Sequence, residues 1–390
     1  MPRSLMTTLP AGFAAHTANI GVKDDTLDFV VVLGNPGTLG AAMFTKSRFA
    51  GASVVLSREL VAAGRTRGVV VLSKNSNVAT GDEGMRNARE LVGAVAGRLG
   101  CDANELVIAS TGVIGRQYPM DRIRRGIEAL PATLLGTDAD LVARAIMTTD
   151  TRPKTAEASV RGSSARVVGV AKGVGMIEPD MATHISLIFT DASLSRGELE
   201  TAFRHAVEHT FNRVSIDTDT STSDTTVCLA SGAAGAVDRT AFADALHEVL
   251  LSLTKQIARD GEGAERIIEV RVDQARDEEQ AVTVARAIVN SPLVKTAVHG
   301  ADPNWGRVAM AVGKCSQYED IRAERVIIRF GAQEVFPSQV DASGLARLSN
   351  YMRSDEVLIH VSLGTGNAQA TVWGCDLSAG YVRNNADYTT

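Results

Sequence analysis

The chain is 390 residues long, with 45% apolar residues, 22% charged residues and a formal net charge of −5 at pH 7. This length exceeds what one compact core usually holds, so we expect two domains, and the composition is that of an ordinary globular protein. Because the net charge is negative and the charges are dispersed along the chain, we expect no nucleic-acid partner.

Cysteine and hydropathy patterns exclude further classes of protein. The cysteines lie far apart and form no Cys-x-x-Cys pair, which argues against a disulfide framework and against a zinc site. They are Cys101, Cys228, Cys315 and Cys375. No apolar run reaches the length of a membrane span, and the N-terminal residues lack the apolar core of a signal peptide. We therefore expect a cytoplasmic protein with no membrane partner.

The first third of the chain alternates strand-like runs with helical patterns. Buried strands are predicted at 29–33, 68–73 and 106–109, and a helix at 83–99, where apolar residues recur at helical spacing. The third strand runs directly into S-T-G-V-I-G-R. Here the Thr111 hydroxyl and the Gly112 amide lie side by side, and such a pair of donors can stabilise an oxyanion. As a motif alone, S-T-G is more typical of a turn.

The segment A-K-G-V-G-M-I-E-P-D-M-A-T-H-I-S, residues 171–186, is a Gly/Pro loop between two strand-like runs. Such a loop can hold one peptide bond in an exposed geometry, and the candidate bond is Ala182–Thr183. If that bond broke, Thr183 would carry a free α-amine beside its hydroxyl, which is a self-contained nucleophile and base. The simpler interpretation is a connection between two strands.

The segment after this loop contains a helix and a cluster of acidic residues. Ser195 and Glu198 have capping-box spacing and open a helix that extends to about residue 207. The later run F-N-R-V-S-I-D-T-D-T-S-T-S-D-T contains Asp217, Asp219 and Asp224. It lacks the glycine and glutamate of a calcium loop, so we expect these side chains to bond the backbone of a tight turn, without a metal.

Helical and strand patterns continue to the C-terminus. The clearest helix, 242–257, ends in R-D-G-E-G-A, which places Glu262 between two glycines. The segment N-S-P-L-V-K-T-A-V-H-G-A-D-P-N-W-G-R contains a lone histidine, His299, which is more often structural than catalytic. Further predicted elements are strands at 225–230, 267–272, 326–330, 357–363 and 370–375 and a short helix at 345–352.

Several of these segments together resemble one family. K-G-V-G-M-I-E-P-D-M-A-T is similar to the self-cleaving segment of the ornithine acetyltransferases, the glutamate N-acetyltransferases of the arginine pathway. The S-T-G loop, A-I-M-T-T-D-T, the segment 290–307 and the C-terminus also match, so the resemblance covers the chain from about residue 10 onwards. S-R-F-A-G and T-S-T-S-D-T are closest to the branch found in clavulanic acid gene clusters. His184 and Asn384 stand where the family usually has apolar residues.

The resemblance implies an activity and a set of roles. The chain would cleave itself at Ala182–Thr183 into α and β fragments, 1–182 and 183–390, that assemble as an α2β2 heterotetramer. Thr183 would carry an acetyl group from N2-acetyl-L-ornithine to L-glutamate in a ping-pong mechanism. Thr111 and Gly112 would form the oxyanion hole. The substrate contacts would come from Thr148, Lys172, Thr183, Glu262, Asn385 and Thr390.

The charges of Lys172 and Glu262 suggest that they bind the carboxylate and the ammonium group of an amino-acid substrate. No cofactor or metal is expected. Whether acetyl-CoA also serves as a donor, and whether the pathway is arginine or antibiotic synthesis, stays open at this level.

The same resemblance implies the fold class, α/β, as a layered α/β/β/α sandwich with a smaller C-terminal α/β domain. We expect residues 1–240 in the sandwich and 241–364 in the smaller domain, with the tail 365–390 returning to the active site. An N-terminal-threonine amidase or aminopeptidase of related fold is the nearest alternative. A nucleotide-binding protein that uses Gly173-x-Gly175 lacks the other residues of a phosphate loop, and a non-enzymatic scaffold would remain uncleaved.

Overall fold

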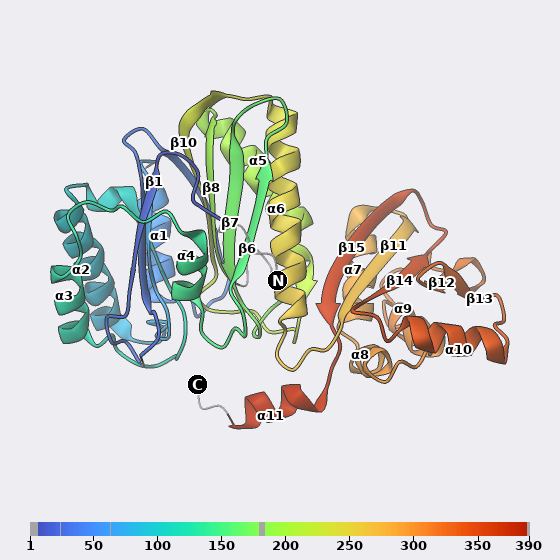
Figure 1. Ribbon diagram of the computed structural model, residues 1–390. Helices are drawn as coiled ribbons and strands as arrows, with labels where there is room; N and C mark the ends of the chain where they lie inside the picture. The colour runs from blue at the N-terminus through green and yellow to red at the C-terminus, as the bar shows by residue number, and fades with distance from the viewer. Residues whose placement is uncertain (1–6, 24, 63, 179–183, 388–390) are drawn as a thin grey trace, which may run out of the picture.

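The computed structural model describes residues 7–23, 25–62, 64–178 and 184–387. Two facing β-sheets, each covered on its outer side by helices, form a four-layered sandwich, and a third sheet with its own helices lies beside it (Figure 1). This is the expected α/β/β/α sandwich with a smaller C-terminal α/β unit.

The first sheet has the strand order β1-β2-β4-β5. Its strands are β1 (Phe13–Ala18), β2 (Phe29–Gly34), β4 (Gly68–Leu72) and β5 (Leu106–Ser110). Alternate residues of β2 face opposite sides, so Phe29 and Val31 pack against the helices while Val30 and Val32 face the second sheet. The covering helices are α1 (Ala52–Ala62), α2 (Gly81–Leu99) and α3 (Met120–Glu128).

The second sheet has the order β3-β10-β8-β7-β6. Its strands are β3 (Leu39–Phe44), β10 (Thr225–Ala236), β8 (Ile185–Ser193), β7 (Arg166–Lys172) and β6 (Lys154–Ser159). Ile185 pairs with both Lys172 and Thr225, so the end of β7 and the beginnings of β8 and β10 meet at one edge. The outer face is covered by α5 (Arg196–His209) and α6 (Arg239–Arg259), and α4 (Ala139–Ile146) packs with the core between the sheets.

A capping box marks the start of one helix of the sandwich, as the sequence predicts. Ser195 and Glu198 form both hydrogen bonds of a capping box at the start of α5. Thr80 lies at the N-cap position of α2 but makes no side-chain capping bond. The predicted strand 225–230 is longer than expected, because β10 continues to Ala236 with a shift of register between Ala230 and Gly235.

The third sheet has the order β13-β12-β14-β11-β15-β9. Its strands are β13 (Gln333–Phe336), β12 (Ile327–Phe330), β14 (Glu356–Ser362), β11 (Ile267–Ala275), β15 (Ala368–Cys375) and β9 (Val214–Ser215). Its helices are α7 (Glu278–Val289), α8 (Pro292–His299), α9 (Trp305–Gly313) and α10 (Ala342–Tyr351). Short 3₁₀ turns lie at Ala103–Glu105, Phe211–Arg213 and Ala323–Arg325.

The packing of α6 bears on the expected domain boundary at residue 240, which stays a prediction. That boundary falls at the start of α6, whose apolar side belongs to the same core as β7 and β8 because Leu246, Leu250 and Leu253 pack there. The third sheet begins only at β11. β15 also lies inside this sheet, so the segment that returns toward the sandwich begins after Cys375 and contains α11 (Ala379–Asp387). We propose that the domains meet in the loop 260–266.

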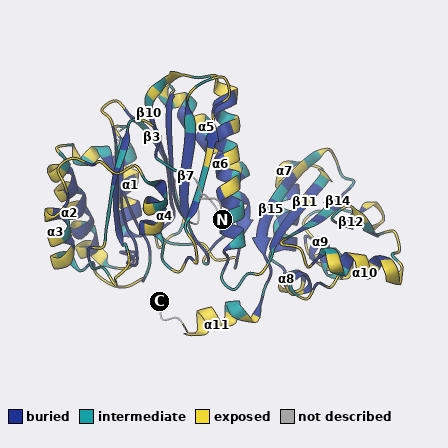
Figure 2. Ribbon diagram, in the orientation of Figure 1, coloured by how far each residue is buried: buried dark blue, intermediate teal, exposed yellow. Residues whose placement is uncertain are grey.

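Burial follows these layers. Both sheets of the sandwich are buried on their two faces, the third sheet is buried against its helices, and α11 is exposed (Figure 2). In the ranges that the structure describes, no helix is long and apolar enough to cross a membrane.

Candidate active site

A cavity of about 140 Å³ lies where six separate segments of the chain meet. It brings together six residues that the sequence predicts for the site, and they come from the loop after β5, the loop after α4, the end of β7, the loop after α6 and α11. These residues are Thr111, Gly112, Thr148, Lys172, Glu262 and Asn385. Ala182, Thr183 and Thr390, which complete the predicted set, lie outside the described residues.

The Thr111 hydroxyl has one hydrogen-bonding partner that orients it. Lys172 Nζ donates to Thr111 Oγ1 at 3.1 Å. An ammonium group only donates, so the Thr111 oxygen accepts this bond and its own hydrogen remains available to another acceptor. In the described part of the chain, no acceptor is bonded to the Gly112 amide. Two donors therefore lie next to each other on the cavity wall.

Gly112 also meets a steric requirement for glycine. Its φ is +130°, and a Cβ atom there would lie 2.2 Å from the carbonyl carbon of Lys74 and 2.6 Å from the backbone nitrogen of Asn75. Both neighbours are backbone atoms, which cannot move aside as a side chain could. Only glycine allows the T-G loop to pack this closely on the segment that follows β4.

Lys172 supplies the positive charge of the cavity. Burial lowers the pKa of its ammonium group, and the nearby Asp150 carboxylate acts in the opposite direction. Lys172 lies at the last position of β7, opposite Ile185 at the first position of β8. A positive charge therefore lies next to the strand that begins directly after the predicted nucleophile.

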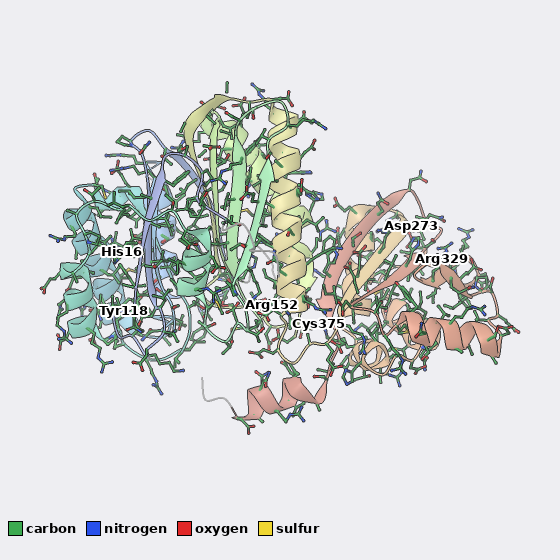
Figure 3. All side chains as sticks on the ribbon, in the orientation of Figure 1. His16, Tyr118, Arg152, Asp273, Arg329 and Cys375 are labelled. Atoms are coloured by element: carbon green, nitrogen blue, oxygen red, sulfur yellow. The ribbon has the colours of Figure 1, made fainter. Side chains whose placement is uncertain are left out.

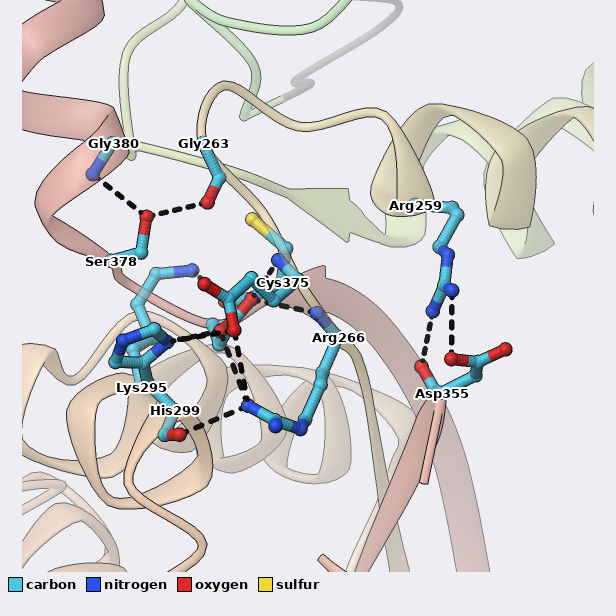
Figure 4. A network of polar contacts seen from close by, with 11 residues as sticks. Arg259, Gly263, Arg266, Lys295, His299, Asp355, Cys375, Ser378 and Gly380 are labelled. Carbon is cyan, nitrogen blue, oxygen red and sulfur yellow. Dashed lines mark hydrogen bonds and ion pairs between the residues drawn. The ribbon is translucent and has the colours of Figure 1, made fainter. Parts of the chain in front are cut away.

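Glu262 supplies the negative charge, and two segments hold it in place. Asn385 Nδ2 donates to Glu262 Oε2 at 2.7 Å, and the Glu262 amide donates to the Val174 carbonyl at 2.8 Å. The C-terminal segment approaches closely because Gly263, with φ +70°, leaves room for the Tyr381 amide, which would lie 2.3 Å from a Cβ atom. Ser378 Oγ donates to the Gly263 carbonyl at 2.5 Å and fixes this approach (Figure 4).

A buried ionic network behind the cavity holds three of its loops. Lys154 Nζ lies 2.7 Å from Asp150 Oδ1 and 2.6 Å from Asp260 Oδ2, and all three side chains are at most 2% exposed. Asp150 also accepts the amides of Thr148 and Gly173, at 3.1 and 2.7 Å. Burial raises the pKa of Asp150, but the ammonium groups of Lys172 and Lys154 lower it further, so its pKa lies below the ordinary value.

Asp260 connects this network to the loop that carries Glu262. It accepts the amide of Thr151 at 3.2 Å, and Arg152 Nε lies 3.5 Å from its Oδ1. Arg152 lies beside the lower end of α6, on the side of the sandwich (Figure 3). This network was not among the residues predicted from the sequence. The available sequence signal was Lys154, the first residue of β6, because the other inward-facing residues of this strand are apolar.

Replacing Lys154 by methionine is expected to destabilise the protein strongly. Methionine is of similar length but removes the buried cation that both carboxylates share, and removing one partner of a buried ion pair typically costs about 3–5 kcal/mol. Urea denaturation followed by circular dichroism measures the change. Arg161→Met is the matched control, because Arg161 is 81% exposed and pairs with an exposed Asp244. Equal stability of the two variants would contradict a structural role for the network.

His184, the first residue described after the predicted cleavage point, has a buried side chain. Its ring packs edge-on against Phe211 with centroids 4.2 Å apart, and neither ring nitrogen has a hydrogen-bonding partner among the described residues. Burial, with smaller contributions from Lys172 and Lys154, lowers the pKa of His184 to about 3. The ring therefore fills an apolar site, as the usual apolar residue would.

Within the residues that the structure describes, the acidic side chains of the segment 211–225 form no group that could hold a metal ion. Asp217 accepts the Asp219 amide of its own turn at 3.4 Å, as the turn interpretation predicts, but its shorter bonds reach the Met176 and Ile177 amides of a distant segment. Asp219 is exposed. Asp224 is 2% exposed, its Oδ2 has no partner in the described part of the chain, and burial raises its pKa well above the ordinary value. Ser221, Thr222 and Ser223, which the sequence analysis did not single out, line the cavity.

His299 belongs to a separate network (Figure 4). Its Nδ1 lies 2.8 Å from Asp376 Oδ2, and the Glu265 carboxylate lies within 4.8 Å of both. The Asp376 carboxylate also accepts the amides of Glu265 and Arg266, and the Arg266 guanidinium lies 3.9 Å from it. These bonds connect the start of β11 to the end of β15, so the network is a structural junction.

The fold and the cavity are those of an α/β protein in which an ammonium group and a carboxylate line one small cavity. The sequence model of the ArgJ family matches residues 14–390, and the chain belongs to this family.

Individual relatives agree with this assignment. The chain is 56% identical to "Glutamate N-acetyltransferase Oat2" of Streptomyces clavuligerus over 98% of both chains, which agrees with the expected branch. It is 50% identical to "Arginine biosynthesis bifunctional protein ArgJ 2" of a Nostoc species, over 98% of this chain and 99% of the relative. A solved ArgJ structure from Bacillus halodurans matches 51% of this chain and 96% of its own, with 40% identity and a TM-score of 0.48.

Proposed function

We propose that this chain is a glutamate N-acetyltransferase that cleaves itself at Ala182–Thr183 and then moves an acetyl group from N2-acetyl-L-ornithine to L-glutamate. The observation that carries this proposal is the cavity, which joins the Thr111–Gly112 donor pair, Lys172 and Glu262 at the edge where β8 begins. Membership of the ArgJ family supports the same chemistry.

In the first half-reaction, Thr183 Oγ attacks the acetyl carbonyl while the α-amine of Thr183 takes the hydroxyl proton. The negative charge that develops on the carbonyl oxygen is stabilised by the Thr111 hydroxyl and the Gly112 amide. The amine of ornithine takes up the proton and leaves. Glutamate then attacks the acetyl ester with its amine, and acetylglutamate departs with Thr183 restored.

Lys172 and Glu262 bind groups of opposite charge on the amino-acid substrate. Lys172 attracts the α-carboxylate and Glu262 the ammonium group of the amino acid. Thr148, Asn385 and Thr390 add polar contacts. We further propose that the α and β fragments assemble as an α2β2 heterotetramer and that no cofactor takes part. Acetyl-CoA is tested below as a second acetyl donor.

Mass spectrometry of the acetyl-enzyme tests the proposal. Incubation with acetylornithine alone should add about 42 Da, one acetyl group, to the fragment that begins at Thr183, as covalent catalysis requires. Glutamate should then remove the added mass and yield acetylglutamate, and initial rates should follow a ping-pong pattern. The same incubation with acetyl-CoA shows whether it also acylates the enzyme.

Two results would contradict the proposed transfer. Rapid loss of the acetyl group to water, at a rate independent of glutamate, would indicate an N-terminal-threonine amidase. Intersecting double-reciprocal lines with no acetyl adduct after rapid quenching would indicate direct transfer between two bound substrates.

A further inference from the structure

The segment just before the predicted cleavage point forms one wall of the cavity. Val174, Gly175 and Met176 line it. Gly175 lies directly against the Glu262 side chain, because a Cβ atom on Gly175 would lie 2.7 Å from its carboxylate carbon. The Glu262 amide also donates to Val174. Any shift of this wall therefore moves Glu262, which is proposed to bind the substrate ammonium group.

This wall contains an unfavourable backbone conformation. Met176 has φ +55°, in the left-handed region that a residue with a long side chain rarely adopts, although its side chain is 40% exposed. Such a conformation is less populated than the ordinary backbone conformations by a factor on the order of ten or more. It persists only where surrounding contacts hold it. The apolar side chain of Met176 is too exposed to supply that restraint by packing.

Asp217 supplies the restraint. Its Oδ2 accepts the Met176 amide at 2.7 Å, and its Oδ1 accepts the Ile177 amide at 2.8 Å. One carboxylate thus holds two successive amides at the strained position. Charge-assisted bonds of this kind are stronger than bonds between neutral groups.

Further contacts hold Glu178, which follows Ile177. Ser215 Oγ and Asn290 Nδ2 both donate to Glu178 Oε2, at 2.9 and 2.6 Å, and Thr220 Oγ1 donates to the Glu178 carbonyl at 3.1 Å. The donors all come from residues after position 183, whereas 176–178 come before it. Under the proposed cleavage, these bonds therefore join the β fragment to the end of the α fragment.

We infer that Asp217 is a positioning residue that fixes the left-handed conformation of Met176 and so keeps the 174–178 wall, and with it Glu262, in place after cleavage. This inference rests on the proposed function. It assigns the first of the three aspartates in the D-T-D-T-S-T-S-D-T segment a role in substrate binding that acts through Met176, without contact between Asp217 and the substrate.

Asp217→Asn tests the inference. An asparagine can accept one amide hydrogen but turns its NH₂ group toward the other, so the wall should relax. We expect cleavage to remain complete while the KM for acetylornithine rises about tenfold or more, with a smaller change in kcat. The matched control is Asp219→Asn, two residues away, which removes the same charge from an exposed position and should keep the wild-type KM.

Glycine at position 176 provides a rescue that a merely structural role would not show. Glycine adopts positive φ without strain, so Asp217 should matter less in its presence. The KM of the Met176→Gly/Asp217→Asn double variant should lie within about twofold of that of Met176→Gly alone. Should Asp217→Asn fail to fold, Asp217→Glu, which keeps the charge but displaces the carboxylate by one methylene, is compared with and without Met176→Gly in the same way.

The outcomes separate this inference from the proposed function. Wild-type protein that neither cleaves nor transfers acetyl groups overturns the function before any variant is compared. An active wild type in which Asp217→Asn and Asp219→Asn have equal KM values overturns only the role of Asp217. A raised KM that Met176→Gly does not rescue also overturns it, because the effect then does not act through the Met176 backbone.

Discussion

Thr183→Ala protein is expected to run as a single 41.1 kDa band on a denaturing gel and to transfer no acetyl group. One hydroxyl serves both reactions, since it attacks the Ala182 carbonyl during cleavage and the acetyl carbonyl during transfer. Wild-type protein should instead run as two fragments, 1–182 and 183–390, and Edman sequencing of the second should begin T-H-I-S-L.

Thr183→Ser is the matched control for this prediction. Serine keeps the β-hydroxyl and removes only a methyl group, so it should retain part of both cleavage and transfer. Neither variant changes the charge of Lys172 or Glu262, which isolates the hydroxyl as the tested group. Acetyl transfer by the alanine variant would show that another residue is the nucleophile.

Thr111→Val should lower kcat about 10²–10³-fold and leave the KM for acetylornithine nearly unchanged. Valine has a similar volume but no hydroxyl, so it removes one of the two donors proposed for the oxyanion, and loss of one such donor typically has this effect. The charge on the oxygen develops only in the transition state, which is why binding should change little. Steady-state kinetics with acetylornithine and glutamate measures both constants.

Circular dichroism and a thermal scan provide the control for Thr111→Val. The Lys172 ammonium loses its 3.1 Å acceptor in this variant, so the fold and the cleavage must be shown to be intact. Substituting Gly112 is a poorer test of the same hypothesis, because any side chain there would collide with the backbone of Lys74 and Asn75. A valine variant with wild-type kcat would remove Thr111 from the oxyanion hole.

The site was predictable to the extent that its residues lie in recognisable segments. Thr111, Gly112, Thr148, Lys172, Glu262 and Asn385 were all singled out from sequence segments, and the structure brings them to one cavity. Ser221, Thr222 and Ser223 also line the cavity. The network behind the cavity was not predicted, because a lysine at the start of an otherwise apolar strand does not indicate its partner, and Asp260 differs in no local pattern from residues at ordinary helix ends.

The sequence by itself determined the local elements and the family. Runs of valine and isoleucine specify strands that are buried on both faces, the Ser195–Glu198 pair specifies where α5 begins, and the ordered motifs identify the chain as an ArgJ-type acetyltransferase. These are short-range properties, because neighbouring side chains and the backbone between them carry the whole signal.

Only the tertiary structure decided how the loops are held. Lys154 meets Asp260 across 106 positions of sequence, and Asp217 holds Met176 across 41. Both contacts join segments that the two packed sheets and α6 bring to one edge of the sandwich. Burial strengthens the Lys154–Asp260 contact, because a charge removed from water must find its partner inside the protein. No pattern within either loop specifies that partner.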